Sequence, residues 1–160
     1  MIQIKNTQRK IPINEPQLEA DLQVILRALK YSDFDISVLI TTNKNIRAYN
    51  RTYRHKDTPT DILSFPYHPD VQAGKRVRVS HEEDKNLGDL IISAERVAHD
   101  AQELKVTLDA RMRRLVAHGV CHLLGYDHII DADWRRMRAK EGFLLKTLNA
   151  LPKRTPVPPC

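Results

Sequence analysis

The sequence of 160 residues predicts an α+β fold, a small mixed sheet of four strands packed with about five helices. Two observations support this class. Short β-branched segments and longer segments with helical spacing follow one another irregularly, without the regular alternation of a parallel α/β sheet. The chain also shows no internal repeat and no internal linker. We therefore expect one domain over residues 1–151, followed by a flexible proline-rich tail at 152–160.

The first half of the chain contains three predicted strands and two predicted helices. Residues 2–6 alternate like a strand. A helix is expected from Asn14 to about Tyr31, because its first residue is a cap, a proline follows in the first turn and leucines recur at helical spacing. A β-branched strand covers 35–41, and a second helix covers 43–53. The segment 58–66 predicts a strand bracketed by prolines, which favours an edge position in the sheet or a strand that is paired only briefly.

A polar stretch at 67–86 separates this half from the next strand. We expect it to form a long loop with a hairpin around Val77–Val79. A strand follows at 87–93. Ser93 then caps a helix that runs to about Leu104.

Two further helices complete the predicted domain. Thr107 caps the first of them, and the second starts at Asp131 or Asp133. The side chains expected to pack this last helix recur at helical spacing and are Trp134, Met137, Leu144, Leu145 and Leu148.

The net charge of the chain is +6, which favours a polyanionic partner, because lysine and arginine contacts to phosphate dominate nucleic-acid affinity. A solvated helix face is the alternative explanation for its basic clusters, at Arg111, Arg113, Arg114, Arg135, Arg136, Arg138 and Lys140. No stretch reaches the apolar length of a membrane span. The two cysteines, Cys121 and Cys160, give no disulfide framework, which indicates a reducing compartment.

The most informative stretch is 118–128, where three histidines recur as H-x3-H-x5-H. Residues four apart on a helix share a face, so His118 and His122 can point at a common centre. Gly125 can adopt the left-handed conformation that ends a helix, which turns His128 back toward the first two histidines. Three neutral imidazoles and one open position are typical of a catalytic zinc site, here on a central helix and its following turn.

Residue 119 bears on the chemistry of this site. The same spacing occurs in metzincin proteases, where a glutamate directly after the first histidine is the general base. Gly119 cannot take this role, which weakens the metalloprotease alternative. Zinc alone lowers the pKa of water and polarises a phosphoryl oxygen, and a nearby arginine would balance the charge of a phosphodiester transition state. The pattern therefore favours phosphodiester cleavage over peptide cleavage.

Two further blocks accompany the histidine run His118-Gly-Val-Cys-His122-Leu-Leu-Gly-Tyr-Asp-His128. Residues 50–66 are similar to N-x-x-Y-R-x-x-D-x-P-T-D-V-L-S-F-P, and residues 87–93 are similar to L-G-D-I-x-I-S. Together the blocks resemble the signatures of the YbeY endoribonucleases, single-strand-specific RNases of ribosomal RNA maturation. The departures are small, since Cys121 replaces the usual leucine and Ile62 replaces valine.

The resemblance implies that His118, His122 and His128 bind one Zn²⁺ per chain and that His118 is catalytic. It also implies that Arg54 lies in the cleft as a catalytic or RNA-binding residue. It also implies cleavage of single-stranded RNA in 16S-type rRNA 3′-end maturation and in ribosome quality control. The expected partners are RNA and the ribosome or its small subunit, with no DNA and no membrane. The expected location is the cytoplasm, or the mitochondrion if the source is eukaryotic.

Several roles stay open on the residues alone. Arg54 can stabilise transition-state charge, neutralise a phosphate or be a solvated residue at a helix end. Asp61 and Asp89 can orient an imidazole or cap the ends of strands. The non-enzymatic alternative is a ribosome-associated module with a structural zinc, which needs a fourth protein ligand. Cys121 is the nearest candidate, and a small buried hydrophobe is its alternative role.

Overall fold

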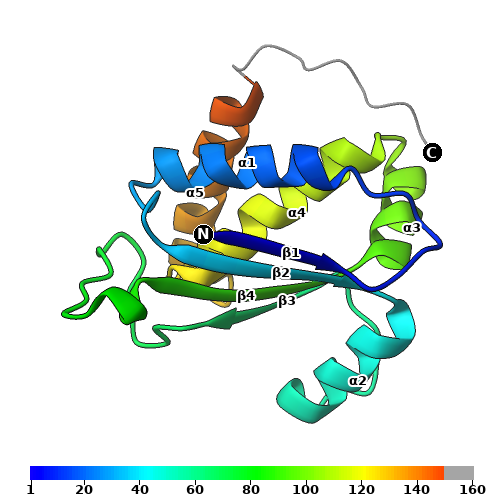
Figure 1. The fold of residues 1–160 in the computed structure, drawn as a ribbon, viewed down its shortest axis with the longest axis horizontal. Helices are drawn as coiled ribbons and strands as arrows, with labels where there is room; N and C mark the ends of the chain where they lie inside the picture. Colours follow the sequence, from blue (N-terminus) through cyan, green and yellow to red (C-terminus); the bar gives the residue numbers. More distant parts are fainter. Residues whose placement is uncertain (150–160) are drawn as a thin grey trace.

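The computed structural model describes residues 1–149 (Figure 1). The predicted tail at 152–160, with Cys160, lies outside the described residues. Within them, four strands and five α-helices confirm the α+β class. In chain order the elements are β1 (Ile2–Asn6), α1 (Glu15–Ala28), β2 (Asp35–Thr41), α2 (Asn43–Arg54), β3 (Ile62–Pro66), the 3-10 helix η1 (Glu82–Asp84), β4 (Asn86–Ser93), α3 (Ala94–Leu104), α4 (Leu108–Leu123) and α5 (Asp131–Asn149).

The four strands form one mixed sheet in the order β1-β2-β4-β3. β1, β2 and β4 are parallel, and β3 runs antiparallel to β4 at the edge of the sheet, as the flanking prolines predicted. β3 begins at Ile62, later than the predicted Thr58. The Thr58 carbonyl accepts a hydrogen bond from the Asn50 side chain (2.9 Å), so this segment belongs to the connection after α2 and not to the sheet.

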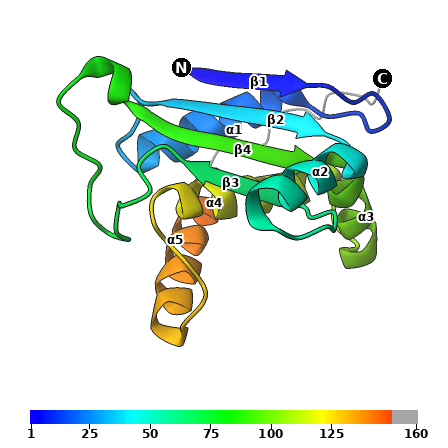
Figure 2. The same ribbon diagram turned by 90° about the horizontal axis from the view of Figure 1, so that it is seen from below.

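Helices α1, α4 and α5 cover one face of the sheet, and α2 lies on the other (Figure 1, Figure 2). Because side chains alternate along a strand, Val38 and Ile40 of β2 enter the main core beneath the larger helical layer. On the opposite face Ile46 of α2 packs with Leu63 and Ile91. Helix α4 packs against α1, α3, α5 and the strands β3 and β4, so it is the central helix that the sequence predicted.

The predicted hairpin around Val77–Val79 is wrong, since this segment forms no strand and the loop carries only η1. The Val77 backbone N–H donates to the Tyr31 hydroxyl (2.9 Å), and the Val77 side chain is buried in the main core. Contacts of this kind, rather than a pair of strands, therefore hold the loop against the rest of the domain.

Helix α5 buries Met137, Leu144 and Leu148 as predicted, but it leaves Trp134 46% exposed. The first turns of α5 extend away from the sheet, where a side chain has few neighbours to pack against (Figure 2). The Arg138 guanidinium lies 5.1 Å from the centroid of the Trp134 ring. None of the described helices is long and apolar enough to cross a membrane.

Candidate metal centre

Helix α4 and the turn after it bring the three histidines together. His118 and His122 lie one turn apart on α4. Thr107 caps the start of this helix, and its hydroxyl accepts a hydrogen bond from the backbone N–H of residue 110 (3.1 Å). The helix ends at Leu123, and the chain turns back at Gly125, which adopts a positive φ of 88°. As a result, one ring nitrogen of each histidine, His128 included, lies within 4.8 Å of the others. The geometry predicted from the spacing is confirmed.

The spacing of the ring nitrogens suits a metal ion. The Nε2 atoms of His118 and His122 are 3.1 Å apart. Two nitrogens bound tetrahedrally to one zinc at ordinary bond lengths are about 3.3 Å apart. Burial lowers the pKa of His122, and the neighbouring His118 and His128 rings lower it further, which favours the neutral imidazole that a metal requires. These three residues therefore fit a metal ion with three protein ligands and an open position.

A carboxylate on α5 orients the first histidine. Glu141 Oε1 lies 2.7 Å from His118 Nδ1, and both side chains are partly buried. This contact leaves Nε2 as the nitrogen that faces His122. Histidine ligands commonly donate their second ring N–H to a carboxylate, which fixes the tautomer and the ring orientation. Glu141 was not among the predicted site residues, although an acidic residue between Met137 and Leu144 on the buried stripe of α5 was a signal.

Replacing Glu141 with glutamine is expected to weaken zinc binding by about tenfold or more, because an outer carboxylate of this kind raises the basicity of its imidazole. Competition with a chromophoric chelator would measure the affinity. Glu19→Gln, which neutralises an exposed carboxylate on α1, is the matched control and should bind zinc like the unaltered chain. Equal affinities for the two variants would show that Glu141 does not tune the centre.

The structure does not bring Asp61 or Asp89 against a histidine. Asp89 is exposed on β4, opposite Phe65 of β3, and lines a hollow of about 760 Å³ on the α2 face of the sheet, whereas α4 packs on the other face. Asp61 Oδ1 accepts from the backbone N–H of Ile62 (2.7 Å), which matches the strand-end alternative.

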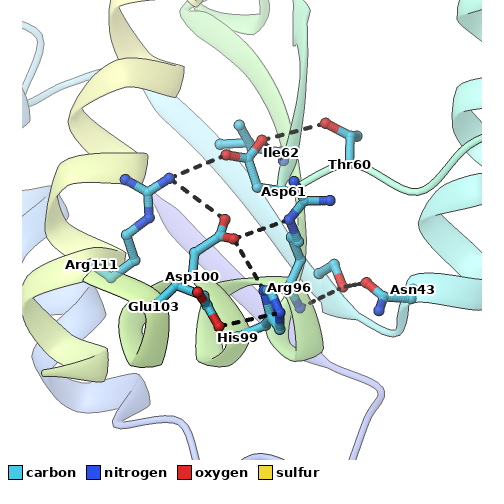
Figure 3. A network of polar contacts seen from close by, with 10 residues as sticks. Asn43, Thr60, Asp61, Ile62, Arg96, His99, Asp100, Glu103 and Arg111 are labelled. Atoms are coloured by element: carbon cyan, nitrogen blue, oxygen red, sulfur yellow. Dashed lines mark hydrogen bonds and ion pairs between the residues drawn. The ribbon is translucent and has the colours of Figure 1, made fainter. Parts of the chain in front are cut away.

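Asp61 is also tied to helices α3 and α4 (Figure 3). The Arg111 guanidinium lies 3.5 Å from Asp61 and 3.7 Å from Asp100, and Asp100 in turn pairs with Arg96 (3.1 Å). Within residues 1–149, Glu141 is thus the carboxylate that contacts an imidazole ring of the centre, whereas Asp127 accepts from the backbone N–H of His128 and Asp61 belongs to an ion-pair network.

Arg54 lies across a cleft from the histidines. The cleft has a volume of about 740 Å³ and is lined by the three histidines, Arg54, Lys56 and Asp61, among others. Arg54 ends α2 on the opposite face of the sheet, but its Nη2 donates to the carbonyl of Ser64 on the edge strand (2.6 Å). The guanidinium also lies 5.3 Å from the centroid of the Phe65 ring. The side chain therefore reaches the cleft around the edge of β3.

The connection between α2 and β3 is fixed by the same block of sequence. Asn50 is buried and holds the Thr58 carbonyl, while Asp57 pairs with Arg47 (2.9 Å). His55 ends α2 in a left-handed conformation, with φ of 58°. These contacts explain why residues 50–66 act as one unit that presents Arg54 and Asp61 to the cleft.

Gly119 faces the sheet and not the cleft. A Cβ built on it would lie 2.7 Å from Ile62 Cδ1 and 2.9 Å from Leu90 Cδ2. Glycine at this position therefore allows α4 to approach β3 and β4 closely. A glutamate here would enter this packed contact, so the structure offers no place for the general base of a metalloprotease at residue 119.

Cys121 is fully buried in the main core and does not belong to the histidine group. Burial, and to a smaller extent the carboxylate of Glu141, raise the pKa of its thiol to about 12. Its complete burial and its place outside the histidine group match the small buried hydrophobe of the two alternatives. Among the described residues, nothing closes the centre with a fourth protein ligand.

The fold and the cleft together define the class of the protein, an α+β domain with a three-histidine centre that opens into a cleft beside an arginine. Comparison with known proteins gives the family. Residues 3–149 match the model of the family described as Endoribonuclease YbeY, and the chain belongs to this family.

Individual relatives agree with this assignment. The chain is 37% identical over 146 residues to Endoribonuclease YbeY of Homo sapiens, which covers 91% of this chain and 87% of the relative. It is 41% identical over 150 residues to Endoribonuclease YbeY of Geobacter metallireducens, which covers 92% and 95%. The solution structure of TM1509 from Thermotoga maritima matches the fold with a TM-score of 0.61 and 23% identity, over 92% of this chain and 89% of that one.

Proposed function

We propose that this chain is a zinc-dependent endoribonuclease that cleaves single-stranded RNA, in 3′-end maturation of 16S-type rRNA and in ribosome quality control. The observation that carries the proposal is the three-histidine group that faces Arg54 across one cleft. The names of the relatives support RNA as the substrate. The small ribosomal subunit is the proposed partner, with neither DNA nor a membrane as a target, and the cytoplasm, or the mitochondrion of a eukaryote, is the proposed location.

His118, His122 and His128 would hold one zinc ion per chain. When bound, zinc supplies positive charge that lowers the pKa of water and polarises a phosphoryl oxygen. The protein contributes the orientation of the ligands, since Glu141 fixes the His118 ring and the Gly125 turn places His128. His118 is therefore catalytic through the ion that it binds.

Arg54 supplies the second charge of the cleft. A guanidinium carries donors that match two oxygens of a phosphate, and it remains protonated at any physiological pH. Only Nη2 of Arg54 is engaged with a described residue, the Ser64 carbonyl, so further N–H donors remain for a substrate. We assign Arg54 the stabilisation of the negative charge that grows on the phosphate in the transition state.

Replacing Arg54 with alanine is expected to lower kcat for single-stranded RNA by about a hundredfold, while zinc content stays at one ion per chain. Steady-state cleavage of a labelled oligoribonucleotide and elemental analysis would measure the two quantities. Arg51→Ala removes the same charge from the exposed side of α2 and is the control, expected to keep full activity. Full activity of Arg54→Ala, or its loss of zinc, would contradict the assigned role.

The substrate class is tested on the same samples. The zinc-loaded protein should cut single-stranded RNA, leave the matched RNA duplex largely intact and leave a peptide substrate uncut. Cleavage of the peptide would favour the metalloprotease alternative. Zinc that is retained without cleavage of RNA would favour the ribosome-associated module with a structural zinc.

A further inference from the structure

We propose that a pocket on α5 next to the metal cleft binds one nucleotide of the same single-stranded RNA, with its phosphate on Arg136 and Lys140 and its base on Phe143. The pocket, called here the α5 pocket, has a volume of about 460 Å³. It is lined by those three side chains, by Tyr126 and by Ala73 and Gly74 of the long loop. This inference rests on the proposed function, and it adds a binding site outside the histidine centre.

The α5 pocket adjoins the metal cleft, since the two cavities share a lining residue. Tyr126 lines both cavities, and it directly follows Gly125, the residue at which the chain turns toward His128. The long loop packs against the same turn, because a Cβ on Gly125 would lie 2.2 Å from the Val71 carbonyl oxygen. A strand of RNA that crosses the cleft past His128 therefore meets the α5 pocket on the far side of Tyr126.

The charge of the α5 pocket suits a phosphate. Arg136 and Lys140 lie four residues apart, so their side chains share one face of α5. Neither forms an ion pair with any carboxylate of residues 1–149, and no acidic side chain lines the pocket. Two neighbouring cations that have no counter-charge repel each other. An anion that binds between them removes this repulsion, so its binding is favourable.

The aromatic side chain of the pocket suits a base. Phe143 is 48% exposed, although a phenyl ring is ordinarily buried. The Lys140 ammonium lies over the Phe143 ring, 5.5 Å from its centroid, so the cation and the ring belong to one site. The small residues Ala73, Gly74 and Ala139 also line the pocket, and nothing lies within 4 Å of a Cβ built on Gly74. Open aromatic faces beside cations are the usual way in which proteins hold single-stranded nucleic acid without reading its sequence.

The test compares two double variants of α5 with equal charge. Arg136→Gln/Lys140→Gln removes the cations of the pocket, and Arg135→Gln/Arg138→Gln removes two exposed cations of the same helix that do not line it. Binding of a fluorescent single-stranded oligoribonucleotide is measured by anisotropy in a His118→Ala background, so that no cleavage disturbs it. We expect the pocket variant to raise Kd about tenfold and the control about twofold or less.

Three further readouts separate the subsite from general electrostatics. The slope of log Kd against log salt should fall by about 0.7 in the pocket variant, as expected for one neutralised phosphate on a single strand. Phe143→Ala should raise Kd about fivefold and leave that slope unchanged, because stacking on a ring is not ionic. In the zinc-loaded enzyme with His118 intact, the pocket variant should raise KM for a long single strand and leave kcat unchanged.

If the two double variants weaken RNA binding equally, the proposed subsite is wrong. It is also wrong if Phe143→Ala binds RNA with the Kd of the unaltered chain. Binding of polyglutamate, a model acidic peptide, is measured on the same variants. If the pocket variant loses polyglutamate binding but retains RNA binding, the pocket belongs to an acidic peptide instead. Failure of the proposed function is distinguishable, because it would show as absent RNA cleavage by the zinc-loaded chain while the pocket variant still lowers RNA binding.

Discussion

Replacing His118 with alanine is expected to remove zinc from the protein and to lower cleavage of single-stranded RNA by about a thousandfold or more. His118 supplies one of three imidazoles, and its Nε2 lies 3.1 Å from that of His122, so the remaining pair offers too few ligands for a tight zinc site. Elemental analysis of the purified protein and cleavage of a labelled oligoribonucleotide would measure the two effects.

The control for this substitution is His99→Ala. His99 lies exposed on α3 and is not part of the histidine group, so its loss should change neither zinc content nor cleavage. RNA cleavage at the original rate by zinc-free His118→Ala would mean that the activity comes from another centre or from a contaminating nuclease, and the proposed function would then fail.

Replacing Gly125 with alanine is expected to destabilise the fold by about 2–4 kcal/mol and to lower zinc affinity as well. The residue has φ of 88°, and an added Cβ would lie 2.2 Å from the Val71 carbonyl oxygen, so both the backbone and the long loop must shift. Because the same turn places His128, the shift moves the third ligand. Thermal unfolding should show a Tm lower by about 5–15 °C.

Gly142→Ala is the matched control for this strain. Gly142 lies in the middle of α5 with nothing within 4 Å of an added Cβ, so alanine there should stabilise the helix by about 0.5–1 kcal/mol. A Gly125→Ala protein that melts at the original temperature and keeps its zinc would show that the left-handed turn is not required.

Local sequence patterns predicted those parts of the fold and site that depend on local geometry. Helix phase places His118 and His122 on one face, and a glycine can end a helix in a left-handed turn, so the histidine centre follows from one short segment. Prolines on both sides of β3 exclude it from the middle of the sheet, and it lies at the edge. The α+β class follows from the order of the elements.

Contacts between distant segments could not be predicted in the same way. Glu141 meets His118 only because α5 packs on α4, and no spacing within one helix indicates that docking. Strand alternation predicts that Asp89 and Leu90 face opposite sides of the sheet, but not which side carries α4. Gly119 suggested a missing base, whereas the packed structure shows a close approach of α4 to Leu90.

The composition of the histidine centre has a consequence for oxidative chemistry. Its three candidate ligands are imidazoles, and the nearby thiol of Cys121 is fully buried and kept protonated. Peroxide oxidises thiolates, and zinc centres built on cysteine lose their ions when the sulfur is oxidised. Within the described residues, this centre presents no sulfur to such an oxidant, so an ion held by it would stay bound under peroxide that empties cysteine-based zinc sites.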